Sequence, residues 1–112
     1  MEKILNVFVL MIFSTGIYAQ ANINNFIDSL ITIEEYNTIV TKYADKSISQ
    51  YSAKSLFNIG FSYYMLENDN DCLKYMDLAI EKDPTIPSPY FIKASIFNYM
   101  NKLEEAIPLF LK

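Results

Sequence analysis

Three acidic side chains occupy every second position of one short segment, and no other segment of this chain is as similar to a metal-binding loop. They are Glu67, Asp69 and Asp71. A calcium loop presents alternating oxygen ligands, turns at a glycine and ends on a distal glutamate. Here no glycine follows in the needed place, and the distal position, counted from Glu67 or Asp69, is the apolar Leu78 or Ile80. We therefore expect a solvated turn between helices and no metal site.

Residues for acid–base or nucleophilic catalysis are equally scarce. The chain has no histidine, which is the commonest general base and metal ligand. Cys72 has no imidazole partner to form its thiolate. The only glycines are Gly16 and Gly60, so there is no glycine-rich phosphate loop. The sequence predicts no catalytic residues, no cofactor and a protein that is not an enzyme.

Cys72 is the single cysteine of the chain and cannot form an internal disulfide. It occupies a position where a small residue recurs later in the sequence, which favours a buried structural thiol. The alternative is a disulfide to a second chain.

The charge of the chain argues against nucleic acid as a partner. The formal net charge is −4, and there is no arginine among the basic residues. Binding to a phosphate backbone requires clustered cations, which this composition does not provide. The remaining partner classes are proteins and peptides, including a second copy of the chain.

The N-terminus has the pattern of an export signal. Lys3 precedes an almost unbroken apolar run over residues 4–13, and small residues then lead to Ala19. This pattern predicts a signal peptide over residues 1–19, cleaved after Ala19, and a periplasmic or secreted protein with no membrane span after cleavage. The alternative is an uncleaved N-terminal helix that anchors the chain, although the run is short for a span.

Helical spacing of apolar residues runs through the rest of the chain. Apolar residues recur at three- and four-residue intervals in three segments, which predicts a helix in each: residues 53–66, 71–82 and 87–100. A further helix is expected after them. Asn70 is the expected N-cap of the second of these helices. Residues 20–52 carry two weaker stripes, formed by Ile23, Phe26, Ile27 and Leu30 and by Tyr36, Ile39, Val40 and Tyr43.

Five of these positions recur at an interval of 34 residues, the period of a helix–turn–helix repeat. A repeat of this kind cannot bury its own apolar face and must stack on a neighbour. The paired positions are Leu56 and Tyr90, Gly60 and Ala94, Tyr63 and Phe97, Cys72 and Ala106, and Met76 and Phe110.

This pattern resembles the tetratricopeptide repeat family. The resemblance implies an all-α fold in which antiparallel helix pairs stack as a short right-handed solenoid. One repeat would cover residues 53–86, a second and incomplete one residues 87–112, and a degenerate repeat is expected within residues 20–52. The residues implied to pack the repeats are Leu56, Gly60, Tyr63, Cys72, Met76, Ala79, Pro84, Tyr90, Ala94, Phe97, Ala106 and Phe110. Of these, Tyr63, Phe97 and Phe110 are expected to fill the space between layers.

The first helix of each unit lines a concave groove in this family. The resemblance therefore implies a partner-binding surface formed by Phe57, Phe61, Tyr64, Phe91, Ser95 and Asn98. The three aromatic residues of the first unit are spaced by four and three, so they share one side of a helix. The alternative is that these rings pack against the helices of residues 26–43 and contact no ligand.

Two functional hypotheses follow from the sequence. The first is an exported interaction scaffold or adaptor that binds an apolar or helical segment of another protein in the aromatic groove. The second is a structural fragment, or a self-assembling subunit, of a larger repeat array with no ligand of its own.

Overall fold

The computed structural model describes residues 23–46, 48–100 and the helix over residues 103–110, without the side chains of residues 103, 104 and 106. The predicted export signal over residues 1–19 lies outside the described residues. The packing role predicted for Ala106 concerns a side chain that is likewise outside them.

The described residues form helices joined by turns, with no strand among them, as the sequence predicted for an all-α fold. A helix over residues 23–32 comes first. The other elements are α2 (Tyr36–Tyr43), the 3₁₀ turn η1 (Ile48–Gln50), α3 (Ala53–Met65), α4 (Asp69–Lys82), α5 (Ser88–Tyr99) and α6 (Leu103–Phe110).

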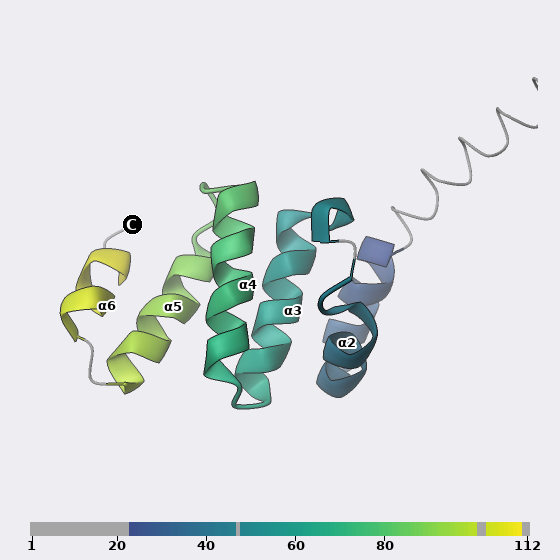
Figure 1. Ribbon diagram of the computed structural model, residues 1–112, viewed down its shortest axis with the longest axis horizontal. Helices are drawn as coiled ribbons and strands as arrows, with labels where there is room; N and C mark the ends of the chain where they lie inside the picture. The colour runs from purple at the N-terminus through teal and green to yellow at the C-terminus, as the bar shows by residue number, and fades with distance from the viewer. Residues whose placement is uncertain (1–22, 47, 101–102, 111–112) are drawn as a thin grey trace, which may run out of the picture.

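The helices from α2 to α6 stand side by side in chain order, and neighbours run in opposite directions (Figure 1). The closest pairing is between α3 and α4. Each of the pairs α2–α3, α4–α5 and α5–α6 is also in contact, and α3 reaches past α4 to touch α5. This last contact matters because it leaves α3 and α5 as neighbours on one face of the molecule.

Gly60 sets the close approach of α3 to α4. A Cβ atom built on Gly60 would lie 2.9 Å from Cε of Met76 and 3.0 Å from Cβ of Tyr75. Both distances are shorter than ordinary van der Waals contact, so a side chain at Gly60 would require the end of Met76 to move and the Tyr75 side of α4 to shift by a few tenths of an ångström. The absence of a Cβ at this position is therefore what lets α3 lie directly on α4.

Polar caps fix where α3 and α4 begin. The hydroxyl of Ser52 accepts a hydrogen bond from the backbone N–H of Ser55 at 3.1 Å, and the side chain of Asn68 accepts one from Asp71. The N-cap of α4 is thus Asn68, and the prediction of Asn70 was wrong. A turn at Glu67 (φ 62°) brings Asn68 to the helix start two residues earlier than the apolar stripe indicated.

The core has two parts. The first surrounds Ile27, Ile39, Tyr51, Ile59 and Tyr75 and joins the N-terminal helices to α3 and α4. The second is formed by Cys72, Met76, Ile92 and Ile96 and joins α4 to α5, with half-buried aromatic residues of α3 around it.

The N-terminal helices bury only part of their predicted stripes. Ile27 and Ile39 are fully buried, whereas Phe26 exposes 58% of its surface. The apolar stripe of this first helix is therefore only partly buried. Because consecutive residues on a helix point about 100° apart, only one of Phe26 and Ile27 can face α3, and Ile27 does so.

Candidate partner-binding groove

Three aromatic rings form a continuous row along α3. The ring centroids of Phe57 and Phe61 are 6.0 Å apart, and those of Phe61 and Tyr64 are 6.1 Å apart. All three side chains are half-buried. The row follows directly from the four- and three-residue spacing, which places successive side chains above one another on a helix. We refer to Phe57, Phe61 and Tyr64 as the aromatic row.

One edge of the aromatic row is covered by the N-terminal helices. The ring of Phe61 meets that of Tyr36 on α2 edge to face, with centroids 6.1 Å apart. Phe57 also packs against the first core cluster. At this edge the aromatic row packs against the N-terminal helices, as the alternative from the sequence predicted, and Phe61 shows this most clearly.

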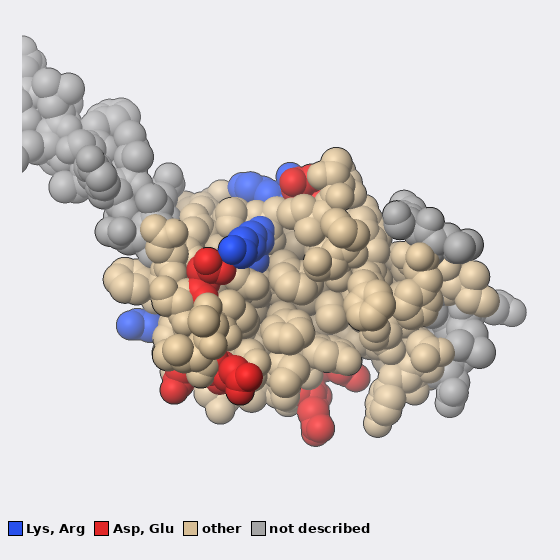
Figure 2. All heavy atoms as spheres, turned by 180° about the vertical axis from the view of Figure 1, so that it is seen from behind, with Lys and Arg blue, Asp and Glu red and all other residues tan. Residues whose placement is uncertain are grey.

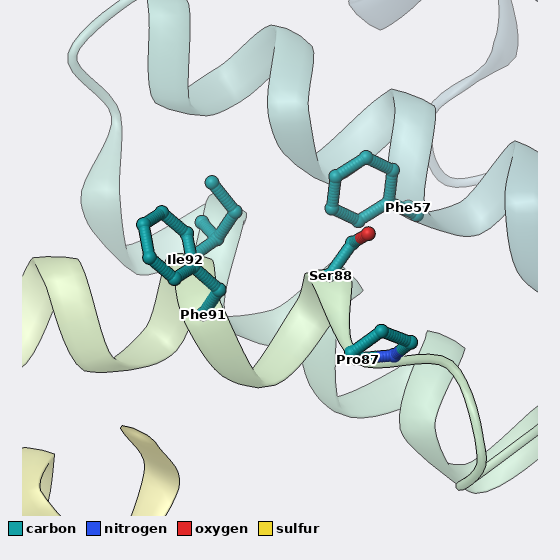
Figure 3. Close-up of a pocket in the computed structure, with 5 residues that line it drawn as sticks. All are labelled: Phe57, Pro87, Ser88, Phe91 and Ile92. Carbon is teal, nitrogen blue, oxygen red and sulfur yellow. The ribbon is translucent and has the colours of Figure 1, made fainter. Parts of the chain in front are cut away.

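The other edge of the row opens between α3 and α5. A cavity of about 330 Å³ lies at the start of these helices, where Phe57 faces the first turns of α5 (Figure 3). Phe91 borders it with 61% of its surface exposed. The lining residues are Phe57, Pro87, Ser88, Phe91 and Ile92. We call this the apolar cavity.

A second cavity of about 510 Å³ lies farther along the same pair of helices, where α3 ends. It combines aromatic and acidic side chains, and its lining residues are Tyr64, Met65, Glu67, Asp69, Ser95, Ile96 and Tyr99. We call this the acidic cavity. The two cavities together form an interrupted groove between α3 and α5.

The structure brings four of the six predicted groove residues to these cavities. Phe57 and Phe91 line the apolar cavity, and Tyr64 and Ser95 line the acidic one. Phe61 lies between them in the aromatic row. Asn98 is exposed and lines neither cavity, because the exposed end of α5 contributes Tyr99 instead.

The face opposite to that shown in Figure 1 carries lysines over its upper part and at one side edge, with acidic side chains beside the upper ones (Figure 2). Its middle carries uncharged residues, and acidic side chains gather along the lower margin of the view (Figure 2). The turn between α3 and α4 lies at this lower end (Figure 1). A surface of this kind suits an uncharged segment across its middle and a cation at the acidic margin.

The residues predicted to pack the repeats have different degrees of burial. Leu56, Gly60, Cys72, Met76, Ala79 and Ala94 are buried, Tyr63, Tyr90 and Phe97 are half-buried, and Pro84 is exposed. Tyr63 stacks on Tyr75 with ring centroids 5.7 Å apart. The hydroxyl of Tyr90 donates a 3.0 Å hydrogen bond to the carbonyl oxygen of Pro84, which ties the start of α5 to the loop before it.

Phe110 does not fill an interlayer space as predicted. It exposes 49% of its surface. Among the described aromatic residues its ring contacts only that of Phe91, in a T-shaped arrangement with the ring centroids 5.9 Å apart. The physical reason is that α6 has a described neighbour, α5, on one side alone. An apolar side chain on its other side therefore faces solvent within the described part of the chain.

The position of Cys72 in the fold makes its thiol unreactive. The side chain is fully buried, and this burial, with a smaller effect from the negative charge of Asp69, raises the pKa of the thiol to about 12. The reactive form of cysteine is the thiolate, so the folded chain holds Cys72 in its unreactive form. This geometry favours a structural thiol over the alternative of a disulfide to a second chain.

Sequence reasoning missed a polar latch between the N-terminal helices and α4. The hydroxyl of Tyr75 accepts a 2.6 Å hydrogen bond from the backbone N–H of Asp45, and Nζ of Lys74 lies 2.9 Å from Oδ1 of Asp45. The hydrogen bond that Lys74 donates to the Asp45 carboxylate and the positive charge of Lys74 lower the pKa of Asp45. Asp45 and Tyr75 are 30 positions apart, so no local pattern in the sequence could have revealed this contact.

A polar contact between the first helix and α3 was also not predicted from the sequence. Oδ1 of Asn24 accepts hydrogen bonds from the backbone N–H of Ser52 and from the hydroxyl of Ser55. Asn58, one helical turn farther along α3, is buried, and its Nδ2 atom has no hydrogen-bond partner among the described residues. Buried serine and asparagine on α3 carry no hydrophobic periodicity, so nothing in the sequence marks this face as internal.

Among the described residues, no group of three or more histidine, cysteine, aspartate or glutamate side chains lies close enough together to hold a metal ion. Among the same residues, no helix combines the length and the apolar character needed to cross a membrane.

Comparison with known protein families, with curated proteins and with solved structures found no match to this chain.

Proposed function

We propose that this chain is a protein-interaction module that binds an apolar or helical segment of another protein between α3 and α5. The observation that carries this proposal is the pair of cavities beside the aromatic row, one of about 330 Å³ and one of about 510 Å³. An aromatic side chain that stays 61% exposed at the edge of such a cavity, as Phe91 does, offers apolar area to a partner.

The proposed architecture is a short tetratricopeptide-like solenoid. The close α3–α4 pair at Gly60, the contact of α3 with α5 and the 34-residue recurrence support it. In such an array the first helices of successive units lie side by side, which would make the α3–α5 groove the concave surface. A binding role, and not an enzymatic one, also agrees with the buried thiol of Cys72.

The proposed location is outside the cytoplasm, in the periplasm or the medium, and the apolar run in residues 4–13 supports it. The experiment is mass spectrometry of the chain expressed in a bacterial host and recovered from its periplasm. A mature N-terminus at Gln20 is the expected result. A chain that stays membrane-bound with Met1 retained would instead establish the uncleaved anchor.

A displayed library of random 16-residue peptides tests the groove without knowledge of the natural partner. Peptides selected on the unmodified chain should lose at least about tenfold in affinity for Phe91→Asp, because a charge then borders the apolar cavity. Ile33→Asp is the matched control, since Ile33 is also an exposed apolar residue, at 66%, and lies outside both cavities. Equal binding to Phe91→Asp and the unmodified chain would exclude this surface.

Self-association through α6 is the second candidate function. Ile107 and Phe110 expose 56% and 49% of their surfaces, and Phe110 lies against the exposed Phe91. Sedimentation equilibrium over a wide concentration range tests this. A concentration-dependent oligomer that Phe110→Asp abolishes would support it, and a monomer at every concentration would contradict it.

A further inference from the structure

The two ends of the groove differ in chemistry, and the difference bears on what the groove recognises. The apolar cavity is lined by Phe57, Phe91, Ile92, Pro87 and Ser88, with no charged side chain. The acidic cavity places the rings of Tyr64 and Tyr99 beside the carboxylates of Glu67 and Asp69, with no lysine in its lining. This inference rests on the proposed function, because it specifies the ligand of the same groove.

The lysines with described ion pairs are engaged elsewhere. Lys54 binds Asp28, Lys74 binds Asp45 and Lys93 binds Asp77, so the three ion pairs of the described residues leave Glu67 and Asp69 without a cationic partner in that set. The neighbouring Asp71 differs from them, because its carboxylate accepts a hydrogen bond from the side chain of Asn68.

Tyrosine rings and carboxylates attract the same type of group. A Lys ammonium or an Arg guanidinium gains from the negative face of a tyrosine ring and from an adjacent carboxylate. Tyr99, with 84% of its surface exposed, is free to close over such a group without a cost in core packing. A neutral apolar side chain would instead have to desolvate both carboxylates, which is unfavourable.

We propose that the groove selects a peptide segment that carries a lysine or arginine for the acidic cavity and a bulky apolar residue for the apolar cavity. Phe57 in the apolar cavity and Tyr64 in the acidic cavity are seven positions apart on α3, which corresponds to about 10 Å along the helix. A ligand helix spans that distance with residues i and i+7, which share one face, and an extended ligand does so over about three residues. The carboxylates of the acidic cavity fix which end of the groove holds the cationic side chain.

The test uses the full mature chain and the same 16-residue peptide library. Peptides selected on it should be enriched in one lysine or arginine at a fixed spacing from an aromatic or aliphatic residue. For the best peptide, replacing that cation by glutamine should weaken binding at least about tenfold, and added salt should reduce the difference. The double variant Glu67→Gln/Asp69→Asn should bind both peptides equally.

Glu34→Gln/Glu81→Gln is the matched control, since it removes the same two charges at exposed positions outside both cavities. It should keep the preference for the cationic peptide. Tyr99→Leu, at an exposed site where folding is not at risk, should weaken the cationic peptide about two- to fivefold and leave the glutamine peptide unchanged.

The outcomes separate this inference from the function on which it rests. Selected peptides that share an apolar residue, lose affinity for Phe91→Asp and show no cation would overturn the inference and leave the groove function standing. A cationic preference that survives in Glu67→Gln/Asp69→Asn would also overturn it. Selection of no peptide that depends on Phe91 would overturn both.

Discussion

The α3–α4 pair and the α5–α6 pair carry the same spacing of apolar and small residues, yet they differ in how much they bury. In the first pair Leu56, Ile59, Tyr75 and Met76 are almost completely buried. In the second pair the large exposed apolar residues are Phe91, Tyr99, Ile107 and Phe110.

The number of neighbours explains the exposure of Ile107 and Phe110 on α6. Described helices flank α3 and α4 on both sides, whereas α6 contacts only α5 among the helices in close contact. A repeat cannot bury its own apolar face, so the same sequence pattern gives a core in one place and an exposed surface in the other. In this molecule the α3–α4 pair holds most of the core, and the exposed apolar surface increases toward α6.

The largest expected effect concerns Cys72, which lies where α4 meets α5. A thiol with a pKa near 12 should react with iodoacetamide at pH 8 at least about a hundredfold more slowly than the same thiol in the unfolded chain. Labelling rates measured by mass spectrometry against urea concentration check this. Fast labelling without urea would mean that α5 leaves α4 readily, and the seam between the pairs would then be weaker than its burial implies.

A pair of isoleucines tests the comparison directly. Ile59→Ala in α3 should lower the free energy of unfolding by about 2–5 kcal/mol, because the residue is completely buried and leaves a cavity. Ile107→Ala in α6 should change it by less than about 0.5 kcal/mol, because more than half of that side chain is in solvent. Urea denaturation followed by circular dichroism measures both. Equal losses would show that α6 is buried against something and would end the distinction between the pairs.

A smaller loss is expected at the polar latch. Tyr75→Phe removes the hydroxyl that accepts the backbone N–H of Asp45, and it should lower the free energy of unfolding by about 1–2 kcal/mol. Tyr63→Phe is the matched control, since Tyr63 makes the same ring stack and shares no hydrogen bond with Asp45 in the described structure. If both variants lose the same amount, ring packing and not the latch holds the N-terminal helices to α4.

The smallest effect is the pH dependence of the Asp45–Lys74 ion pair. Because Lys74 lowers the pKa of Asp45 below its ordinary value of 3.8, the pair stabilises the fold above that value and this contribution is lost as the pH falls through the folded-state pKa. The melting temperature of Asp45→Asn should therefore lie below that of the unmodified chain at pH 6, and the gap should close as the pH falls through the lowered folded-state pKa of Asp45. A gap that stays constant down to pH 2 would assign the effect of Asp45 to its backbone turn.

The sequence predicted the elements whose signal is apolar periodicity. The boundaries expected for residues 53–66 and 87–100 agree closely with α3 and α5, and the aromatic row follows from spacing alone. The position of Gly60 against α4 follows from the same pattern, because a small residue in a regular stripe marks a close approach.

The parts that were missed depend on tertiary or polar contacts. The latch joins Asp45 and Tyr75 across 30 positions, and no local pattern records such a bond. Phe110 was predicted as buried because the repeat pattern assumes a neighbour on both sides of each helix. The acidic cavity was read only as a solvated turn, since Tyr99 joins it from α5 across a distance that spacing along the chain does not reveal.

The backbone of Glu67 has a consequence for how this protein could be engineered. Its φ of 62° lies in the left-handed region. Glycine adopts this conformation without strain, whereas a residue with a Cβ atom is strained by about 1–2 kcal/mol. A selection for heat resistance alone would therefore drift toward glycine at this turn and discard the carboxylate. A selection for binding would keep the glutamate and accept the lower melting temperature, so the residue chosen at position 67 would reveal which of the two properties was under pressure.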